Sequence, residues 1–566
     1  MREKIKNIFK EEGIFYLLIL LCVIAFWIPY MAPGFTEGSE IKFHYARIIT
    51  LADSLKQGIF PAKLRPMHMK LYGYGIGFFY PDLFIYPPAL LIALGAPYDA
   101  VMKVYYFLFT LITLALSFRC FKKISSSKWV AMAGTILFMM SEINDMNIFD
   151  GGGLPHLFCY MFLPLAFCGL LSALRDEKSG YTEFAVGMTM VLLTHNMIFL
   201  TFMFACVLIV LIHGAAIAKK PMVAARLLLV SIVAMVVTTA YWLPAMEQIK
   251  HVEFRVFYNN AYIVSDHILS LSQLIFVEIG VFYFVLFAAA VALFAVMLVK
   301  KRRMPLDIIS VLITSIFLIW FMCSRAVWNS PVGEALNFFE YTDRFDFVLT
   351  VLMVMFICMT LREALSEFGT LIKKGPEMQP GILFVSCIIL MVAARIIARP
   401  QIFTTDFSDR FFLYRDMLME DWQVSGAEWL PKECESSACN APEYAKADDG
   451  SGADGFKHDD AKYFEVWLDL SKEYYDMPYV YYYGYHAYIL DENDNPVREL
   501  EVGEAFDDNG YVRVFMPSDD DTVGHVMTVY RKTFIQKLSY VISLLSTCAL
   551  LVYMILCSGC LRRQQK

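Results

Sequence analysis

Long apolar runs separated by short polar segments repeat along most of the chain. Runs of roughly 18 or more apolar residues are typical of transmembrane helices. The first run follows basic residues, but it is too long for the apolar core of a signal peptide and no small-residue cleavage site follows it, so we expect a retained helix. The pattern predicts a polytopic α-helical membrane protein with about 12 transmembrane helices. The expected spans fall near residues 14–33, 99–119, 128–142, 156–174, 182–196, 198–217, 222–243, 275–299, 305–323, 345–362, 380–397 and 534–557.

Composition and charge agree with this class. Hydrophobic residues make up 58% of the 566 residues and charged residues 18%, with a mean hydropathy of +0.52, which excludes a soluble protein of this length. Positive residues near helix ends prefer the cytoplasm. If residues 80–94 are interfacial or re-entrant, both termini of this plasma-membrane protein are cytoplasmic, and so are all five basic clusters, at residues 122–123, 219–220, 300–303, 373–374 and 562–563.

A polar and acidic segment interrupts the apolar pattern before the last run. Residues 401–530 contain 29 Asp and Glu against 9 Lys and Arg, a balance of −20 within a chain of −7. Aromatic and β-branched stretches at 462–470, 478–490, 496–502, 511–517 and 525–532 predict strands, whereas the Asp, Gly and Ala run at 445–455 predicts a flexible loop. We therefore expect a transmembrane module at 1–398 with an outer amphipathic-helix loop at 34–98, an extracytoplasmic acidic β-rich domain at 399–530, and a last helix with a basic cytoplasmic tail at 531–566.

Two features of the acidic domain leave alternatives open. Its Tyr-rich strands either pack in a core or contact carbohydrate. Cys434 and Cys439 are spaced so that they either form a disulfide outside the membrane or remain thiols.

The outer segment at residues 34–88 carries the densest polar chemistry of the membrane part. Glu40, His44 and Arg47 stand at i, i+4 and i+7, which places them on one face of a helix beside an apolar stripe that includes Ile41 and Ile48. The spacing predicts an amphipathic helix on the membrane surface, with a carboxylate, an imidazole and a guanidinium facing water. Those charges are either functional or merely solvated.

Other polar residues on the expected outer side are weaker candidates for substrate binding. His195 and Asn196 lie at the tip between two apolar runs, where a helix cap is the alternative. Arg344 lies beside two aspartates, and either clamps a lipid-linked phosphate or forms an internal ion pair with these flanking aspartates. The remaining candidates are Lys70, Tyr80 and Asp82 in the first outer segment and Asp150 and His156 in the outer loop at 143–156. That loop either binds substrate or is a solvated connector.

Signatures of nucleotide and metal enzymes are missing from the sequence. It contains no P-loop, no G-x-G-x-x-G after a strand, no H-E-x-x-H and no C-x-x-C pair with zinc spacing. The sequence therefore shows no nucleotide-binding motif that could power ATP-driven transport. No nucleic-acid partner is expected.

Several stretches carry a resemblance to a known family. They are SEIKFHYARI with a following L-x-x-G-x-F-P, YGYGIGFFYPDLFIYPPALL, LLTHN, YWLP, FFEYTDRFDF, EWLP and YYYGYHAYI, and they span most of the chain. The chain resembles the GT-C superfamily of polytopic membrane glycosyltransferases, and more closely the bacterial membrane proteins labelled as having a 6-pyruvoyl-tetrahydropterin-synthase-related domain. It departs from their pattern at Glu40, where relatives carry Asp, and at FDGGGLPH, where an Arg-Gly-Ala-like sequence is common.

The resemblance implies an enzyme that transfers a sugar from a polyprenyl-phosphate-linked donor to an extracytoplasmic acceptor, which is a cell-envelope glycan, a lipid or a protein. Glu40 is then the base, His44 binds the donor phosphate or orients Glu40, and Arg47, Lys70 or Arg344 stabilises the leaving phosphate. A divalent ion, Mg²⁺ or Mn²⁺, shared by Glu40 and either Asp150 or Asp82, is compatible with the superfamily. The rivals are a transporter or flippase for a lipid-linked sugar and a non-catalytic lipid-binding relative.

Overall fold

The computed structural model describes residues 2–27, 35–36, 40–145, 147, 152–258, 263–372, 411–412, 427–435, 444–459, 461–505, 509–517 and 522–563. The chain forms two compact units, and each is described by itself. Unit 1 consists of residues 1–41, 99–234 and 261–413. Unit 2 consists of residues 42–98, 235–260 and 414–566.

Unit 1 is helical. Its helices are α1 (Arg2–Trp27), α5 (Tyr98–Ser125), α6 (Lys128–Met139), α7 (Glu142–Asp145), α8 (Leu154–Leu174), α9 (Lys178–Leu192), α10 (Asn196–Ile212), α11 (Gly214–Ala218), α12 (Pro221–Val237), α14 (Leu271–Gln273), α15 (Val281–Val299), α16 (Leu306–Met322), α17 (Arg325–Trp328), α18 (Pro331–Ala335) and α19 (Asp346–Ile372). A two-residue pair, β1 (Phe35–Thr36) with β2 (Phe411–Phe412), completes it.

Helices α8 and α9 pack backbone against backbone. A Cβ at Gly169 would lie 2.2 Å from the Phe184 nitrogen, and one at Gly187 would lie 2.6 Å from Cα of Ala166. Small residues allow helix axes to approach this closely in membrane proteins, where no hydrophobic effect drives helices together. The hairpin therefore depends on these glycines.

Five described helical stretches are long and apolar enough to cross a membrane, and a sixth exists if α12 and α13 (Thr239–His251) form one broken span. The five are Tyr98–Ser125, Leu154–Leu174, Val281–Val299, Thr342–Glu367 and Phe534–Val552. Shorter apolar helices occur at Glu12–Trp27, Lys128–Met139, Asn196–Ile212 and Leu306–Met322. The count of about 12 spans stays a prediction, and the span expected at 380–397 lies outside the described residues.

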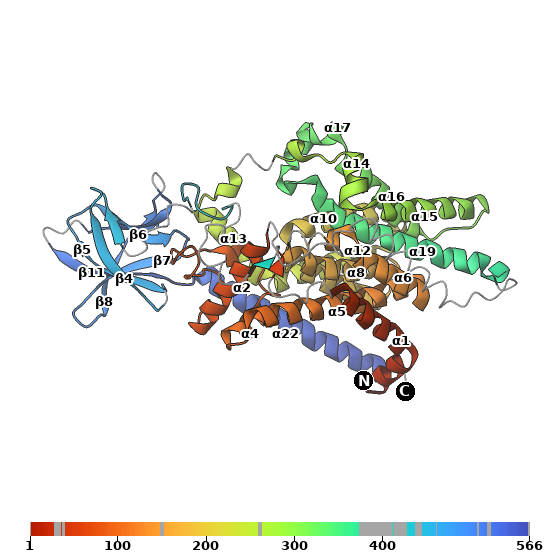
Figure 1. Cartoon of the computed structure of the whole chain (residues 1–566), viewed down its shortest axis with the longest axis horizontal. Coiled ribbons are helices and arrows are strands. Elements are labelled where there is room, and N and C mark those ends of the chain that lie inside the picture. Colours follow the sequence, from red (N-terminus) through yellow and green to blue (C-terminus); the bar gives the residue numbers. More distant parts are fainter. Residues whose placement is uncertain are drawn as a thin grey trace. The chain divides into compact units, whose positions relative to one another are not determined.

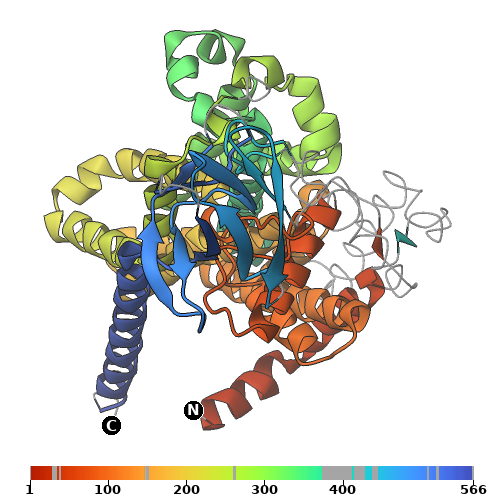
Figure 2. The ribbon, with the colours of Figure 1, turned by 90° about the vertical axis from the view of Figure 1, so that its left-hand side faces the viewer.

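The described residues of unit 2 form five α-helices, a short 3-10 helix at Arg255–Phe257 and a β domain. The helices are α2 (Ile41–Lys56), α3 (Ile76–Phe79), α4 (Tyr86–Ala93), α13 and α22 (Phe534–Arg563). The strands are β3 (Tyr444–Ala447), β4 (Gly452–His458), β5 (Tyr463–Asp469), β6 (Tyr474–Val480), β7 (Tyr485–Leu490), β8 (Pro496–Leu500), β9 (Val502–Glu504), β10 (Tyr511–Phe515) and β11 (Val523–Tyr530). Figure 1 shows the strands gathered in one domain from which α22 leads away, and Figure 2 looks onto the strands.

The strands form a nine-stranded antiparallel sheet in the order β8-β7-β11-β5-β4-β3-β6-β10-β9. Alternation along the strands explains its core. In β5, Phe464, Val466 and Leu468 are buried while the residues between them face outward. Segments 60–80 and 252–254 join the same core, since Tyr74, Phe78 and Phe254 are fully buried in it.

Two expectations for this domain need correction. The run at 445–455, expected to be a flexible loop, contains most of the β3–β4 hairpin, with Gly450 at φ +83° in its turn. Long-range pairing of β4 with β5 and of β3 with β6 overrides the weak strand propensity of Asp and Gly. The stretch at 478–490, expected to be one strand, is divided between β6 and β7. Cys434 is buried and Cys439 lies outside the described residues, so the disulfide stays a prediction.

Candidate functional site

The loop between α2 and α4 folds back on itself and places Asp82 at its centre. The backbone nitrogen of Arg65 donates a hydrogen bond to the carbonyl oxygen of Tyr74 at 3.0 Å, and the Tyr74 nitrogen donates to the Arg65 carbonyl oxygen at 3.1 Å. These two hydrogen bonds close the first part of the loop. Gly77 allows the second part to approach, because a Cβ there would lie 2.7 Å from the Lys63 carbonyl oxygen and 2.9 Å from Oδ2 of Asp82. The turn therefore requires glycine at this position.

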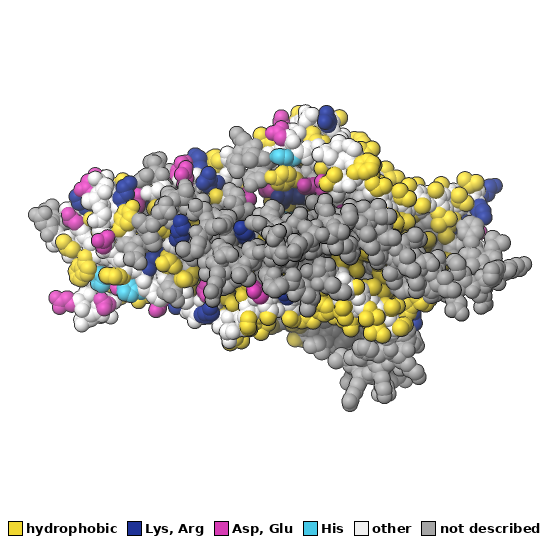
Figure 3. All heavy atoms as spheres, viewed as in Figure 1, with side chains coloured by type: hydrophobic (Ala, Val, Ile, Leu, Met, Phe, Trp, Pro, Cys, Tyr) yellow, Lys and Arg dark blue, Asp and Glu magenta, His cyan; other side chains and the backbone are white. Residues whose placement is uncertain are grey.

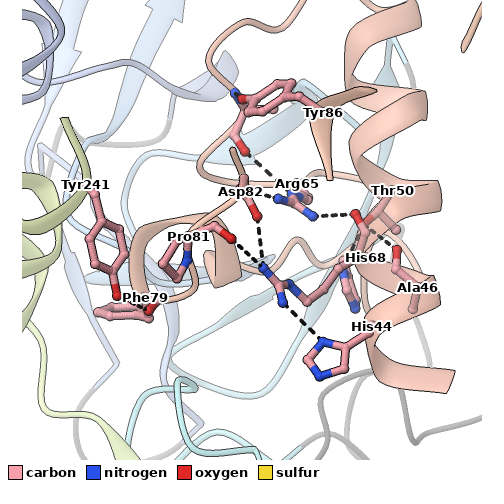
Figure 4. A network of polar contacts seen from close by, with 12 residues as sticks. His44, Ala46, Thr50, Arg65, His68, Phe79, Pro81, Asp82, Tyr86 and Tyr241 are labelled. Atoms are coloured by element: carbon pink, nitrogen blue, oxygen red, sulfur yellow. Dashed lines mark hydrogen bonds and ion pairs between the residues drawn. The ribbon is translucent and has the colours of Figure 1, made fainter. Parts of the chain in front are cut away.

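Two buried guanidinium groups bind the two oxygens of the Asp82 carboxylate (Figure 4). Arg47 donates from Nη2 to Oδ1 at 3.0 Å and to the Pro81 carbonyl at 3.3 Å. Arg65 donates from Nη2 to Oδ2 and from Nη1 to the carbonyl of Arg47. The exposed fractions are 1% for Arg47, 0% for Arg65 and 6% for Asp82, so this charged group is almost entirely removed from water.

Helix α2 positions Arg47 and its neighbours. Nη1 of Arg47 lies 3.1 Å from Nδ1 of His44, one turn earlier. A guanidinium can only donate, so Nδ1 of His44 is the acceptor and the imidazole proton is on Nε2. The guanidinium carbon also lies 4.7 Å from the centre of the Tyr80 ring, a cation–π distance. His44, Arg47, Tyr80 and Asp82 therefore meet in one cluster.

The cluster contains more positive than negative charge. Lys63 is a third cation, and its ammonium lies 5.9 Å from the centre of the Tyr241 ring. Burial and the nearby charge of Arg65 lower the pKa of Lys63 to about 8, although Asp82 opposes this shift. Burial disfavours the charged Asp82, but Arg65, Arg47 and Lys63 outweigh it and hold the Asp82 pKa below its usual range. Three cations thus face one carboxylate.

The outer helix differs from the expected surface helix. We expected His44 and Arg47 to face water, but they are only 2% and 1% exposed. The reason is that Asp82, 35 residues after Arg47, supplies the counter-charge that permits burial. Lys63 and Arg65 were not among the residues predicted from the sequence. Their signal is the Lys-x-Arg-Pro stretch inside a loop of a largely apolar chain, but nothing in the spacing connects it to Arg47.

The remaining candidates of the outer segment are placed differently. Glu40 immediately precedes α2 and belongs to unit 1, so its role stays a prediction. Lys70 is exposed, in a turn where its φ is +53°.

Unit 1 brings together two of the predicted histidines. His156, near the start of α8, stacks on His195, the N-cap residue of α10, with ring centres 4.4 Å apart. Phe347 stacks on the other side of this pair, 5.1 Å from His156. Nδ1 of His195 accepts a hydrogen bond from the Ile198 nitrogen at 3.4 Å. His195 therefore caps the N-terminus of α10, which was the alternative to substrate binding at this position. Asn196 begins α10 beside it.

Arg344 forms the ion pair that was its alternative reading, but with Glu340 rather than with the flanking aspartates. The acidic residues nearby are poorly compensated. Burial and then the charge of Asp343 raise the pKa of Glu278 to about 7. Oδ1 of Asp346 is buried without a hydrogen bond from the described part of the chain. Asp150 lies outside the described residues.

A divalent metal does not fit at Asp82. Both carboxylate oxygens already accept from guanidinium groups, and the net positive charge of Arg47, Arg65 and Lys63 around one carboxylate would repel Mg²⁺ or Mn²⁺. Within the described residues, no group of three His, Cys, Asp or Glu side chains is arranged to hold a metal ion. The pair of Glu40 and Asp150 is untested, because Asp150 is not described.

Comparisons with known proteins identify a family and several more distant likenesses, among them two proteins of different length. An uncharacterised protein of Lactococcus lactis subsp. cremoris is 24% identical over 170 residues, which are 29% of this chain and 28% of that protein. The oligosaccharyltransferase of Archaeoglobus fulgidus, in a crystal structure with zinc and sulfate, matches with a TM-score of 0.38 and 11% identity over 69% of this chain and 53% of that one. The chain thus spans under a third of the one and about half of the other.

The family match is more extensive. The model described as "6-pyruvoyl-tetrahydropterin synthase related domain; membrane protein" matches residues 79–403, more than half of the chain. The matched region includes Asp82, His156, His195 and Arg344 but not Arg47, Lys63 or Arg65. The predicted family is therefore confirmed: the chain belongs to the 6-pyruvoyl-tetrahydropterin-synthase-related membrane proteins.

Proposed function

We propose that this protein is a membrane glycosyltransferase of the GT-C type, and that Arg47, Arg65 and Lys63 bind the phosphate of a polyprenyl-phosphate-linked sugar donor. The observation that carries the proposal is the uncompensated charge around Asp82. Burying charged groups costs free energy unless each has a partner, and in the described part of the chain Arg47 and Arg65 share the single carboxylate of Asp82, while Lys63 forms no ion pair of its own. A phosphate anion would supply the missing negative charge.

The chemistry of the three side chains suits a phosphate. An ammonium group binds phosphate as a point charge, and the two enclosed guanidinium groups, whose Nη atoms already donate to neighbouring atoms, add positive charge behind it. Nε of Arg47 is buried and donates no hydrogen bond in the described part of the chain. Lys63 is the member that solvent partly reaches, whereas both arginines are fully enclosed. We expect the donor phosphate to contact Lys63 first, with the arginines stabilising it from behind.

In the proposed reaction the sugar passes from the donor phosphate to the acceptor hydroxyl group. The acceptor hydroxyl oxygen forms a bond to the anomeric carbon of the sugar, and the bond from that carbon to the phosphate oxygen breaks. The acceptor proton passes to Glu40, to which we assign the base, two helical turns before Arg47 in the sequence. The polyprenyl phosphate leaves with its full negative charge, and the three cations stabilise that developing charge.

The proposal has a direct test in a panel of undecaprenyl-phosphate-linked hexoses presented to the full chain in lipid nanodiscs. We expect release of undecaprenyl phosphate with at least one donor, and loss of release in Glu40→Gln at unchanged protein yield. Lys63→Met should bind donor weakly, whereas Lys56→Met, an exposed lysine at the end of α2, should behave as wild type. Full release of undecaprenyl phosphate by Glu40→Gln would show that Glu40 is not the base. Translocation of the donor across the membrane without release would favour a flippase.

A further inference from the structure

The outward face of strands β8, β7, β11, β5 and β4 carries aromatic and histidine side chains in a regular arrangement. The register places them in cross-strand rows. One row contains Trp467 of β5 opposite His525 of β11. The next row contains Phe456, Glu465, Met527, Tyr488 and Glu499, and a third contains His458, Tyr463, Val529 and His486. In Figure 3 hydrophobic and histidine side chains lie side by side where Figure 1 labels β4, β8 and β11.

Two large rings of this face are unusually exposed. Trp467 is 64% exposed and Phe456 is 72% exposed. These values differ sharply from those of the Tyr-rich strand, where Tyr475 is 3% and Tyr479 is 1% exposed. Tyr475 and Tyr479 of β6 are therefore packed in the core, and the candidates for ligand contact lie on strands β4, β5, β7, β8 and β11.

Aromatic rings of this face stack in parallel pairs with neighbouring side chains. The Trp467 ring lies parallel to the His525 ring, with 8° between the planes and 4.7 Å between the centres. His458 and Tyr463 stack in the same way, at 12° and 5.0 Å. Rings fixed by stacking lose little side-chain entropy when a ligand covers them. The face is therefore preorganised.

Polar groups lie between the rings at fixed positions. Oε2 of Glu465 is 3.2 Å from Nε2 of His458 and 3.7 Å from Nε2 of His525. Nδ1 of His486 is 2.7 Å from Oε1 of Glu499. Carboxylates accept hydrogen bonds, and imidazoles both donate and accept them, so the face offers both kinds of partner beside flat apolar surfaces.

We propose that this face, defined by Trp467, Phe456, Tyr463, Glu465, His458 and His525, binds a neutral carbohydrate chain. A pyranose ring has an apolar face that covers an aromatic ring and hydroxyl groups at its edge that need donors and acceptors. Tyr463 and Trp467 are four residues apart on one strand, about 13 Å at the rise of a β-strand, which is longer than one sugar ring and suits a short chain. Residues 401–530 carry 29 acidic against 9 basic residues, which disfavours anionic lipids, nucleic acids and anionic polysaccharides.

The inference stands apart from the proposed donor site, because carbohydrate binding is measured without any lipid-linked donor. The test uses the full chain in nanodiscs and an array of immobilised neutral oligosaccharides, with cellohexaose and chitohexaose as solution probes and an oligogalacturonate of the same length as the anionic control. We expect binding of neutral chains and at least tenfold weaker binding by Trp467→Ala. Phe515→Ala removes a ring that is 39% exposed on β10, outside the proposed face, and should bind as wild type.

Three results would overturn the proposal. They are the absence of binding to every neutral chain, equal binding of the anionic control, and unchanged binding in Trp467→Ala. A Trp467→Ala variant that binds carbohydrate normally but changes from oligomer to monomer would instead make the face an interface between copies of this chain. The yield and melting temperature of each variant show that it is folded, and Trp467 is exposed enough for its loss to leave the core intact.

Discussion

Replacing Lys63 by Met separates the binding role of the cationic cluster from its cost to folding. The substitution keeps the length of the side chain and removes its charge. The pKa of Lys63 is about 8 instead of 10.5, and since one pKa unit corresponds to about 1.4 kcal/mol, the protonated lysine costs the folded chain about 3 kcal/mol. Solvent reaches part of this side chain, so we expect a smaller gain, about 1–2 kcal/mol, and a melting temperature a few degrees above wild type without ligand.

The same substitution should weaken phosphate binding. A hydrogen bond to a charged group contributes about 1.5–3 kcal/mol, so undecaprenyl phosphate should bind about 10-fold to 150-fold more weakly to Lys63→Met. Native mass spectrometry in nanodiscs measures this loss, and Lys56→Met is the matched control. A melting temperature below that of wild type would show that Lys63 does not destabilise the fold, and unchanged binding of the lipid phosphate would show that Lys63 is not a phosphate ligand.

The pH dependence follows from the same pKa. Lys63 is protonated below pH 8 in the ligand-free chain and loses its proton as the pH rises through that value. The folded pKa is depressed, so the unfolded chain binds more protons between about pH 8 and 10.5, and the cost to folding disappears over that window. Phosphate binding should fall over the same rise in wild type and stay flat in Lys63→Met. A flat wild-type profile between pH 7 and 9 would exclude Lys63 as a phosphate ligand.

Three further substitutions test the counter-charge of the cationic cluster, the turn at Gly77 and the buried carboxyl group of Glu504. Asp82→Asn leaves two buried guanidinium groups without a counter-charge, which should cost about 3–5 kcal/mol. Inorganic phosphate should restore part of the lost melting temperature, and no restoration would argue against an anion site. Gly77→Ala forces a Cβ to within 2.7 Å of a backbone oxygen, so phosphate binding should drop, whereas Gly214→Ala, with open space around it, should have no effect on binding. Burial and then the charges of two nearby glutamates raise the pKa of Glu504 to about 8, so wild-type stability should fall as the pH rises from about 4.5 to 8, and Glu504→Gln should melt higher at pH 7 and lose that slope. Equal pH profiles in thermal unfolding would contradict this.

Local patterns predicted the elements that local physics determines. The apolar runs at 99–119 and 156–174 correspond to Tyr98–Ser125 and Leu154–Leu174, because a helix that satisfies its own backbone in lipid needs only sequence hydrophobicity. Strand β5 followed from its aromatic and β-branched residues. The β3–β4 hairpin did not, because its Asp and Gly residues form strands only through pairing with β5 and β6.

The candidate site was less predictable than the fold. His44 and Arg47 lie on one helix, as their spacing predicts. The direction in which they face depends on Asp82, which is 35 residues after Arg47 in the sequence. Lys63 and Arg65 join through a loop whose path is set by Gly77 and by packing against the β domain, as the contact of Gly75 with Tyr482 indicates. Such contacts connect residues without any periodic relation, so a single sequence does not reveal them.

The cluster around Asp82 is the proposed binding site of the donor phosphate. The most direct measurement is an experimental structure of the full chain in nanodiscs with undecaprenyl phosphate. We expect phosphate density within hydrogen-bond distance of the Lys63 ammonium, on the side of the Arg47 and Arg65 guanidinium groups. Density at Arg344 or elsewhere, with the Lys63 ammonium uncontacted, would contradict it.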